Sequence, residues 1–396
     1  MKIQLTIAAL SALLFCGLAG AQEAVAVKDS VSARLVEAGF SKVRAAETDS
    51  YVIYTVENDA WKLQADGFAE AASIVSGGIP EGKGVKIIAT EYDVPQLTMT
   101  LDPSSRRWST TTRLDESWDL VRREKKLNDT FGKVDIVIYP QVAFMNLIIN
   151  QVYQSLWQIS PALEVSLWPG MKFSYQMVFP IYNDGYAADN GRIHPGMVTL
   201  SQRFRDPWHL NVRGKLTVGA FSNSRYGAAL EMSYFFPNER FSLDTQLGLV
   251  GYYSWSGFKF QYLKEFDFVW NVAANYWCQP LGTQFTLRAQ KFLYGDMGLK
   301  YEMIRHFRRC SVGLYAEKAF DAQLNVGFRF QAALPPFRQK RRGYIPRVKT
   351  SAQMGMSYNA NNELYYYKEF RAEASDNIMQ KNAFNPLYVN AELNSK

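Results

Sequence analysis

The sequence predicts a mainly β protein, a transmembrane antiparallel β-barrel of about twelve strands preceded by a small periplasmic α+β module. The first supporting observation is residues 208–333, where apolar and polar side chains alternate in segments separated by short turns. The second is a secretory signal at the start of the chain. The third is that no later apolar run reaches the about 18 residues that a membrane helix needs. Because a strand projects successive side chains to opposite faces, these segments have one apolar and one polar face, which is typical of membrane-spanning strands.

The first residues have the layout of a secretory signal peptide. A basic residue, Lys2, precedes an apolar run over residues 3–18, and Ala19-Gly20-Ala21 provides a small-residue cleavage site. We therefore predict that residues 1–21 are removed from the mature protein. Cys16 offers the alternative of lipid attachment, but Phe15 stands where a lipoprotein signal needs a small residue.

The aromatic composition suits a membrane interface. The chain contains 25 Phe, 23 Tyr and 9 Trp, and such residues gather where one end of a side chain is apolar and the other wet. A soluble glycan-binding β protein shows the same enrichment. The net charge of +7 either favours acidic lipid or polysaccharide or only aids solubility. Cys278 and Cys310 either pair in an oxidising compartment or stay free.

Residues 22–102 predict the small α+β module. Helical spacing covers residues 31–38 and 63–75, and the second helix stops at Gly77-Gly78. Four strand candidates accompany these helices, at 42–45, 51–56, 85–90 and 96–101. Residues 103–132 are rich in Ser, Thr and charged residues, so we expect a linker there.

Residues 133–336 predict the barrel. In the run that starts at Leu324, Val326 and Phe328 fall on one face while Asn325 and Arg329 fall on the other. The first strand is expected at 133–140. Residues 141–159 also suit a helix, although we favour strands, and Trp168-Pro169-Gly170 forms a turn before a returning strand at 171–181. After a loop at 183–194, further strands are expected at 208–222, 225–236, 240–254, 257–263, 267–278, 283–294, 297–307, 310–319 and 323–333.

An even strand number is expected, because bacterial single-chain barrels close with even numbers, and this favours twelve. Pro335-Pro336 ends the pattern, since proline donates no ladder hydrogen bond. Residues 337–396 are then expected to form a tail that is first basic and later rich in Asn and Tyr.

The polar faces of the predicted strands supply the candidate lumen or glycan contacts. Side chains of both charges and amides would point together into a barrel, where they suit either a hydrated path for polar glycans or a solid polar plug. These candidates are Arg213, Lys215, Asp244, Gln246, Asn271, Asn275, Arg288, Gln290, Lys300, Glu302, Glu317 and Arg329. The opposite, apolar faces would meet lipid.

The sequence offers little conventional chemistry. His194, His209 and His306 lack partners at metal-ligand spacing, and no phosphate loop or nucleophile motif occurs, so we predict no enzyme activity, cofactor, metal or nucleic-acid partner. Glu302 and Glu317 could in principle form the carboxylate pair of a glycosidase, but salt bridges with Lys300 or Arg288 are the favoured interpretation.

A basic run opens the predicted tail. Arg341, Arg342 and Arg347 are candidate contacts for an anionic partner, such as acidic polysaccharide or lipid phosphate. The alternative is an ordinary solvated run of charge.

Several strings carry a family resemblance. RAQKFLYGDMGLKYEM at 288–303, VGLYAEKAF at 312–320 and VGFRFQAALPP at 326–336 resemble the closing strands of the YjbH-like exopolysaccharide-biosynthesis family. VFPIYND at 178–184 and VGAFSNSRYGAALEM at 218–232 are also similar, and GYIPRVKTSAQ and SDNIMQKNAFNP resemble the tail of a Bacteroidetes-type branch. The resemblance covers most of the mature chain, and its strings mark the fold, so no catalytic residue carries over.

The resemblance implies a non-enzymatic outer-membrane β-barrel of a Gram-negative bacterium, accessory to the production or export of an exopolysaccharide. Its expected partners are outer-membrane lipid, extracellular polysaccharide, and periplasmic or outer-membrane export components that dock on the periplasmic module. Two alternatives stay open, a general diffusion porin and a soluble all-β glycan-binding protein or hydrolase.

Overall fold

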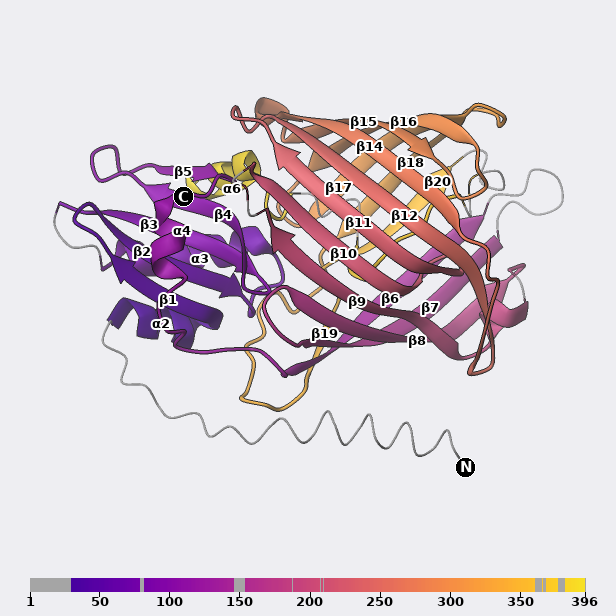
Figure 1. Ribbon diagram of the computed structural model, residues 1–396, viewed down its shortest axis with the longest axis horizontal. Coiled ribbons are helices and arrows are strands. Elements are labelled where there is room, and N and C mark those ends of the chain that lie inside the picture. Colours follow the sequence, from indigo (N-terminus) through magenta and orange to yellow (C-terminus); the bar gives the residue numbers. More distant parts are fainter. Residues whose placement is uncertain are drawn as a thin grey trace.

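The computed structural model describes residues 30–78, 82–145, 154–186, 188–206, 208, 210–359, 365, 368–376 and 382–395. The predicted signal peptide, Cys16 and His209 lie outside these residues. Figure 1 shows a small α+β module beside one large curled sheet. Within the described ranges, no helix is long and apolar enough to cross a membrane.

The N-terminal module is a five-stranded sheet in the order β1-β2-β3-β4-β5, with helices on both faces. Its strands are β1 (Phe40–Glu47), β2 (Tyr51–Asn58), β3 (Gly84–Glu91), β4 (Val94–Leu101) and β5 (Trp108–Thr111). Helices α2 (Ser30–Ala38) and α3 (Gln64–Ser76) pack their apolar faces, including Leu35 and Phe68, on the main core. Helix α4 (Glu116–Val121) packs on the second face, where Val121 contacts Ile53 and Ile88.

The expected linker at 103–132 is wrong in part, because β5 and α4 belong to the module. Trp108 packs against the main core, and Val121 is fully buried on the other face. A few apolar residues within a polar stretch hold β5 and α4 in the module. The overall composition of residues 103–132 therefore did not predict these two elements. Asp115 caps α4 by accepting a hydrogen bond from the backbone N–H of Ser117.

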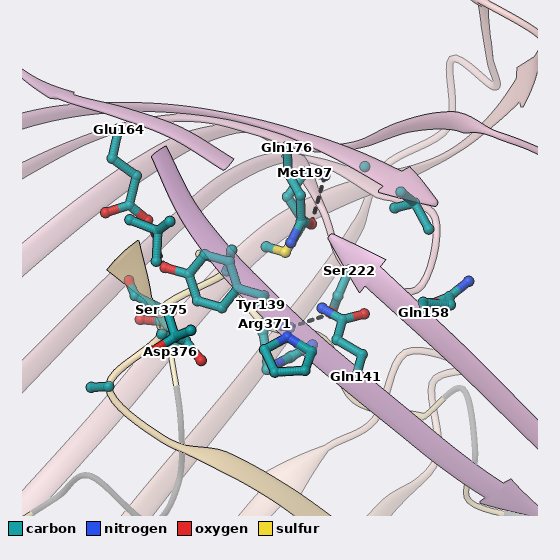
Figure 2. A pocket seen from close by; sticks show the side chains of 18 of the residues that line it. Tyr139, Gln141, Gln158, Glu164, Gln176, Met197, Ser222, Arg371, Ser375 and Asp376 are labelled. Atoms are coloured by element: carbon teal, nitrogen blue, oxygen red, sulfur yellow. Dashed lines mark hydrogen bonds between the residues drawn. The ribbon is translucent and has the colours of Figure 1, made fainter. Parts of the chain in front are cut away.

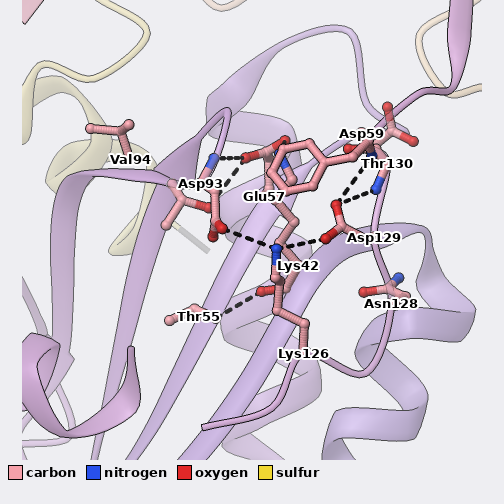
Figure 3. Close-up of polar contacts among 12 residues, drawn as sticks. Lys42, Thr55, Glu57, Asp59, Asp93, Val94, Lys126, Asn128, Asp129 and Thr130 are labelled. Carbon is pink, nitrogen blue, oxygen red and sulfur yellow. Dashed lines mark hydrogen bonds and ion pairs between the residues drawn. The ribbon is translucent and has the colours of Figure 1, made fainter. Parts of the chain in front are cut away.

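A buried ion cluster fastens the end of this stretch to the module (Figure 3). Asp93 contacts Arg44 at 2.8 Å and Lys126 at 3.2 Å, while Glu57 contacts Lys42 at 3.0 Å. Burial raises the pKa of the Glu57 carboxyl despite the opposing charge of Lys42. Burial would also raise the pKa of Asp93, but the hydrogen bond and charge of Arg44, with the charge of Lys126, outweigh it and leave that pKa below its ordinary value.

The large sheet is an antiparallel series in which consecutive strands pair. Its first strands are β6 (Val134–Met145), β7 (Gln154–Ser166), β8 (Met171–Asp184), β9 (His194–Arg205), β10 (Val212–Phe221) and β11 (Arg225–Phe235). It continues through β12 (Phe241–Ser256), β14 (Asp267–Cys278), β15 (Thr283–Lys291), β16 (Met297–His306), β17 (Cys310–Ala319) and β18 (Asn325–Ala332).

These strands differ from the predicted ones in two places. The described parts of 141–159 are strand, as favoured, but β9 was missed, and residues 257–263 give only the short β13 (Lys259–Tyr262), which pairs with the end of β12. Pro195 and Gly196 near the start of β9 weaken its sequence signal. Short 3₁₀ turns, Ala188–Gly191 and Gln279–Leu281, lie in the connections.

The predicted tail is not a separate segment, because its first part adds a strand to each end of the large sheet. Strand β19 (Arg347–Thr350) pairs in parallel with β6, and β20 (Met354–Asn359) pairs antiparallel with β18. The two ends of the hydrogen-bonded path therefore belong to one stretch, residues 347–359, which we call the closing segment. It runs in the same direction as β6. Among the described residues, the consecutive series from β6 to β18, leaving out β13, contains twelve strands, the number that the sequence favoured.

Burial along the large sheet is the reverse of that in a water-soluble protein. On β16, Leu299 and Tyr301 are 49% and 46% exposed, whereas their neighbours Lys300 and Glu302 are 2% and 1% exposed. The same alternation runs along β17, where every second residue is buried. The outer face is therefore apolar and exposed, and the inner face is polar and buried.

A described part of the chain beyond β20 lies against the polar inner face of the large sheet. Residues 368–376, which we call the interior segment, contact the inner faces of β8, β9, β10, β15 and β16. Helix α6 (Pro386–Leu393) follows and packs on α3 and β5 of the module. Its N-terminus is capped by Asn385, which accepts from the N–H groups of Leu387 and Tyr388.

Candidate functional site in the interior of the large sheet

The inner face carries all twelve predicted lumen residues. These residues face the interior segment, a contact that the sequence did not predict. Eleven of them line one cavity of about 770 Å³, and the twelfth, Glu302, is not part of its lining. That cavity, which we call the second cavity, also takes in Glu369, Phe370 and Arg371 of the interior segment. The polar face is therefore packed against part of the chain itself.

One group of charges gathers around Glu369. Lys300 contacts Glu369 and Glu317, each at 2.9 Å, and Gln290 donates to Glu369 at 2.9 Å. Cross-strand register explains the grouping, because Lys300 lies opposite Arg288 on β15 and opposite Glu317 on β17.

The two carboxylates considered for hydrolysis both lie in salt bridges. Glu302 contacts Arg329 at 2.9 Å and Arg288 at 3.4 Å. Glu317 contacts Lys300 and accepts a hydrogen bond from Asn325 at 2.6 Å. The predicted salt bridges with Lys300 and Arg288 are confirmed.

The remaining predicted residues form hydrogen bonds within the wall. Asn275 donates to Asp244 at 2.8 Å and accepts from Thr286 at 2.7 Å, and Asn271 donates to Gln246 at 2.9 Å. Arg213 lies over the ring of Phe235 at 4.8 Å. These contacts hold the side chains in fixed positions along the strands.

A second group of charges gathers around Glu373, which is fully buried. Its carboxylate lies 3.0 Å from Lys172 on β8, 3.2 Å from Arg203 on β9 and 3.1 Å from Lys215 on β10. Asp376 adds a contact of 2.6 Å to Lys215. Of these residues only Lys215 was predicted. The others were missed because the tail was expected to lie outside, although Lys172, Ser174 and Gln176 alternate on the inner face of β8 as a sequence signal.

The interior segment is fixed by its backbone and by one aromatic ring as well as by charge. The N–H of Leu293 donates to the carbonyl of Lys368 at 3.0 Å, and the N–H of Ser222 donates to the carbonyl of Arg371 at 3.1 Å. The ring of Phe370 stacks on Phe221 at 5.4 Å. Ionic, backbone and apolar contacts therefore hold the interior segment against the large sheet.

A larger cavity of about 1390 Å³, the first cavity, lies on the other side of the interior segment. Its lining includes Trp61 and Lys62 of the module at one end and Arg192 and Tyr294 of the connecting loops at the other. The middle is lined by uncharged polar side chains, by the carboxylate of Glu164, and by the interior segment with Arg371 and Asp376 (Figure 2). Those labelled there include Tyr139, Gln141, Gln158, Gln176, Ser222 and Ser375.

The basic residues proposed for an anionic partner are mostly used within the protein. Arg347 contacts Asp59 of the module at 2.7 Å and Asp135 of β6 at 2.8 Å. Arg341 contacts the same two carboxylates at 3.3 and 2.7 Å. Arg341 and Arg347 therefore join module and sheet, whereas Arg342 is exposed. Contact with an anionic partner stays a prediction.

In the part of the chain that the structure describes, the site contains no disulfide and no metal-ligand cluster. Cys278 and Cys310 are free thiols at the ends of their strands, so the disulfide alternative is not realised. Within the ranges that the structure describes, no group of three or more His, Cys, Asp or Glu side chains could hold a metal ion.

Fold and site define a mainly β protein whose large sheet has a polar inner face occupied by its own C-terminal chain. No family model matches the sequence, and no curated protein is similar to it. Among solved structures, the chain is similar to a double mutant of the Rh. blastica porin, with 8% identity over 57% of this chain and 100% of the porin, at a TM-score of 0.30. A triple mutant of that porin gives 9% identity over 50% and 89%, at 0.29.

Proposed function

We propose that the chain is an outer-membrane β-barrel, accessory to the production or export of an exopolysaccharide and without enzyme activity of its own. The observation that carries the membrane assignment is the exposed apolar outer face, for example Leu287, Leu299 and Leu314 on three successive strands, each about half exposed. Side chains of this kind are stable in contact with lipid and not with water. The buried charges behind them fit the polar interior of such a barrel.

Closure of the barrel is part of this proposal. A spanning sheet in lipid has to satisfy its backbone groups, so its edges need to be paired. The closing segment supports this, since β19 is bonded to β6 and β20 to β18. The barrel would then close through one strand, whose first half is bonded to the start of β6 and whose second half is bonded to β18; the rest of the β6 edge lies beside this second half without a ladder.

The connections support an orientation with the module in the periplasm. At the module end, Trp168–Gly170 forms a tight turn between β7 and β8, and the N–H of Gly170 donates to the carbonyl of Tyr92 in the module. The longest connections, such as the one between β12 and β14 that contains β13, lie at the other end. Outer-membrane barrels have short periplasmic turns and long extracellular loops.

The interior segment favours a dedicated barrel over a general diffusion porin. Glu369 and Glu373 bind it to opposite walls, so it takes up space that a porin leaves to water. Ion pairing of Glu302 and Glu317 favours a structural role for these carboxylates over hydrolysis. The polysaccharide role draws its support from the resemblance of the strand sequences and from the glutamine, serine and tyrosine side chains in the lining of the first cavity, which match sugar hydroxyl groups.

Two experiments test the proposal. For the membrane part, purified outer membranes are run on gels with and without heating. We expect the mobility of the protein to depend on heating, and recovery of the protein in the soluble periplasm would contradict the membrane assignment.

For the polysaccharide part, the gene is deleted and then complemented in its host. We expect the amount of extracellular polysaccharide to fall on deletion and to return on complementation. Unchanged polysaccharide would contradict the accessory role. Cleavage of polysaccharide that disappears in Glu302→Gln/Glu317→Gln would favour the hydrolase alternative.

A further inference from the structure

The closing segment leaves one strand edge without a ladder. Strand β19 is bonded to β6 only over Asp135–Ile138, and the N–H of Ser351 gives the last bond, 2.8 Å, to the carbonyl of Ile138. Strand β20 then lies beside the rest of β6 but is bonded to β18. Among the described residues no ladder joins β20 to β6. We call this boundary between residues 139–145 and β20 the seam.

The first cavity reaches the seam from the inside. Gln141 on β6 lies opposite Gln158, and both line the cavity. The next residue, Val142, lies opposite Trp157, which is 46% exposed, so Val142 belongs to the outer face. Val142 also borders the cavity, and so the cavity extends to the edge of β6.

On the other side of the seam, β18 and β20 also present polar residues inward and apolar residues outward. Gln331 on β18 is 1% exposed and belongs to the inner face, whereas Phe330 is 42% exposed and pairs with Met356, 40% exposed. All three border the first cavity. The cavity is therefore polar inside the seam and apolar on the outer side.

The inner part of the cavity is suited to an uncharged, hydroxyl-rich group. Gln176 is 2% exposed, lines the cavity, and its Nε2 has no hydrogen-bond partner within the described ranges. Gln141 and Gln158 come from neighbouring strands (Figure 2). A glutamine amide offers donors and an acceptor, which match hydroxyl groups that donate and accept. Charged side chains lie nearby. Lys172 pairs with Glu373 at 3.0 Å, Asp376 pairs with Lys215 at 2.6 Å, and Glu164 accepts a hydrogen bond from Tyr139 at 2.6 Å. Arg371 also lines the cavity.

We propose that the seam is a lateral binding site for an amphiphile with an uncharged sugar-like head and an acyl chain. The head lies in the first cavity against Gln141, Gln158 and Gln176, and the chain leaves between Val142 and Met356 into the lipid. Hydroxyl groups of the head also satisfy backbone groups at the edge of β6, which lipid alone cannot do. This inference rests on the proposed membrane location, and it adds a ligand class and an entry route.

The test uses the full-length protein in lipid nanodiscs and a photoactivatable dodecyl maltoside as the probe. Labelled peptides are identified by mass spectrometry. We expect labelling concentrated at residues 139–145 and at β20, and competition by unlabelled dodecyl maltoside that is about tenfold better than by maltose or by dodecylphosphocholine. Even labelling of all outward-facing strands, or equal competition by the three compounds, would overturn the site.

A cross-link across the seam gives a second readout. In a Cys278→Ser/Cys310→Ser background, Val142→Cys and Met356→Cys are joined by a short bismaleimide. The matched control joins Leu287→Cys and Tyr301→Cys, which are also outward-facing and lie opposite each other in the complete β15–β16 ladder. We expect the seam cross-link, and not the control, to reduce probe labelling about tenfold.

Heat-dependent gel mobility distinguishes failure of the lateral binding site from failure of the membrane assignment. Protein that shows the barrel mobility shift but labels equally with and without the seam cross-link overturns the lateral site and leaves the membrane assignment intact. Protein without the shift overturns the membrane assignment, and the lateral site with it.

Discussion

The carboxylate of Glu373 in the C-terminal chain lies 3.0 Å from the ammonium group of Lys172 on β8, and both side chains are almost completely buried. Arg203 and Lys215 approach the same carboxylate from the next two strands. One residue of the interior segment therefore neutralises charge on three strands of the sheet. This makes Glu373 the anchor of the segment on that wall.

Replacing this anchor should loosen the interior segment. Glu373→Gln leaves three buried cations with less compensating charge, and breaking a buried ion pair costs about 3–5 kcal/mol. We expect amide hydrogen exchange over residues 368–376 to accelerate while exchange in β14–β16 is retained. Asp321→Asn in an exposed connection is the control. Unchanged protection of the segment in Glu373→Gln would show that Glu373 is not the anchor.

Removing the interior segment should turn the barrel into a wider pore. Replacement of residues 368–376 by a Gly/Ser sequence of equal length keeps α6 attached to the module. In planar bilayers we expect a conductance well above that of the parent chain, because the first and second cavities would merge. Equal conductance of both proteins would mean that the segment does not limit the passage, as in the porin alternative.

The outer face should tolerate charge poorly. Leu299 on β16 is 49% exposed and Leu120 on α4 of the module is 45% exposed, so the two differ in surroundings and not in exposure. In lipid, Leu299→Arg should cost about 2–4 kcal/mol near the middle of the membrane. Leu120→Arg faces water and should change stability by less than about 0.5 kcal/mol. Unfolding titrations in vesicles measure both, and equal effects would argue against a membrane-facing Leu299.

The ion pairs between module and sheet should act together. Arg347 contacts Asp59 of the module and Asp135 of β6, so it couples the two parts. In a double-mutant cycle of Arg347→Ala and Asp59→Ala, we expect a coupling energy of about 1–3 kcal/mol. Protease sensitivity of the boundary between module and sheet is the readout. Arg342→Ala, which is exposed, is the control, and additive effects of the two changes would contradict the coupling.

The module should lose stability in acid through Asp93. Its pKa is held below the ordinary value by Arg44 and Lys126, so the ionised form is favoured in the folded state. This contribution is complete above the unfolded-state pKa and is lost as the pH falls through the lower, folded-state pKa. We expect the stability difference between the parent and Asp93→Asn to shrink as the pH is lowered below about 4. A difference that stays constant would exclude Asp93 as the titrating group.

The strand content and the two faces could be predicted from the sequence because both depend on local alternation. The inward placement of Lys300, Glu302 and Glu317 follows from their spacing in neighbouring strands, and cross-strand register then pairs them. Residues 103–132 show the limit of composition. Only contact with Ile53 and Ile88 explains why Val121 is buried in a helix there.

Sequence by itself determined which side chains alternate, and hence the class of fold and the polar inner face. Tertiary structure decided where the last fifty residues go. The closing segment, the interior segment and α6 have no strong periodicity of their own. Several of the contacts that hold them are to residues more than a hundred positions away, such as Lys172 for Glu373 and Asp135 for Arg347. Such placements depend on charges that meet only after the sheet has curled, so no local pattern in the chain could have specified them.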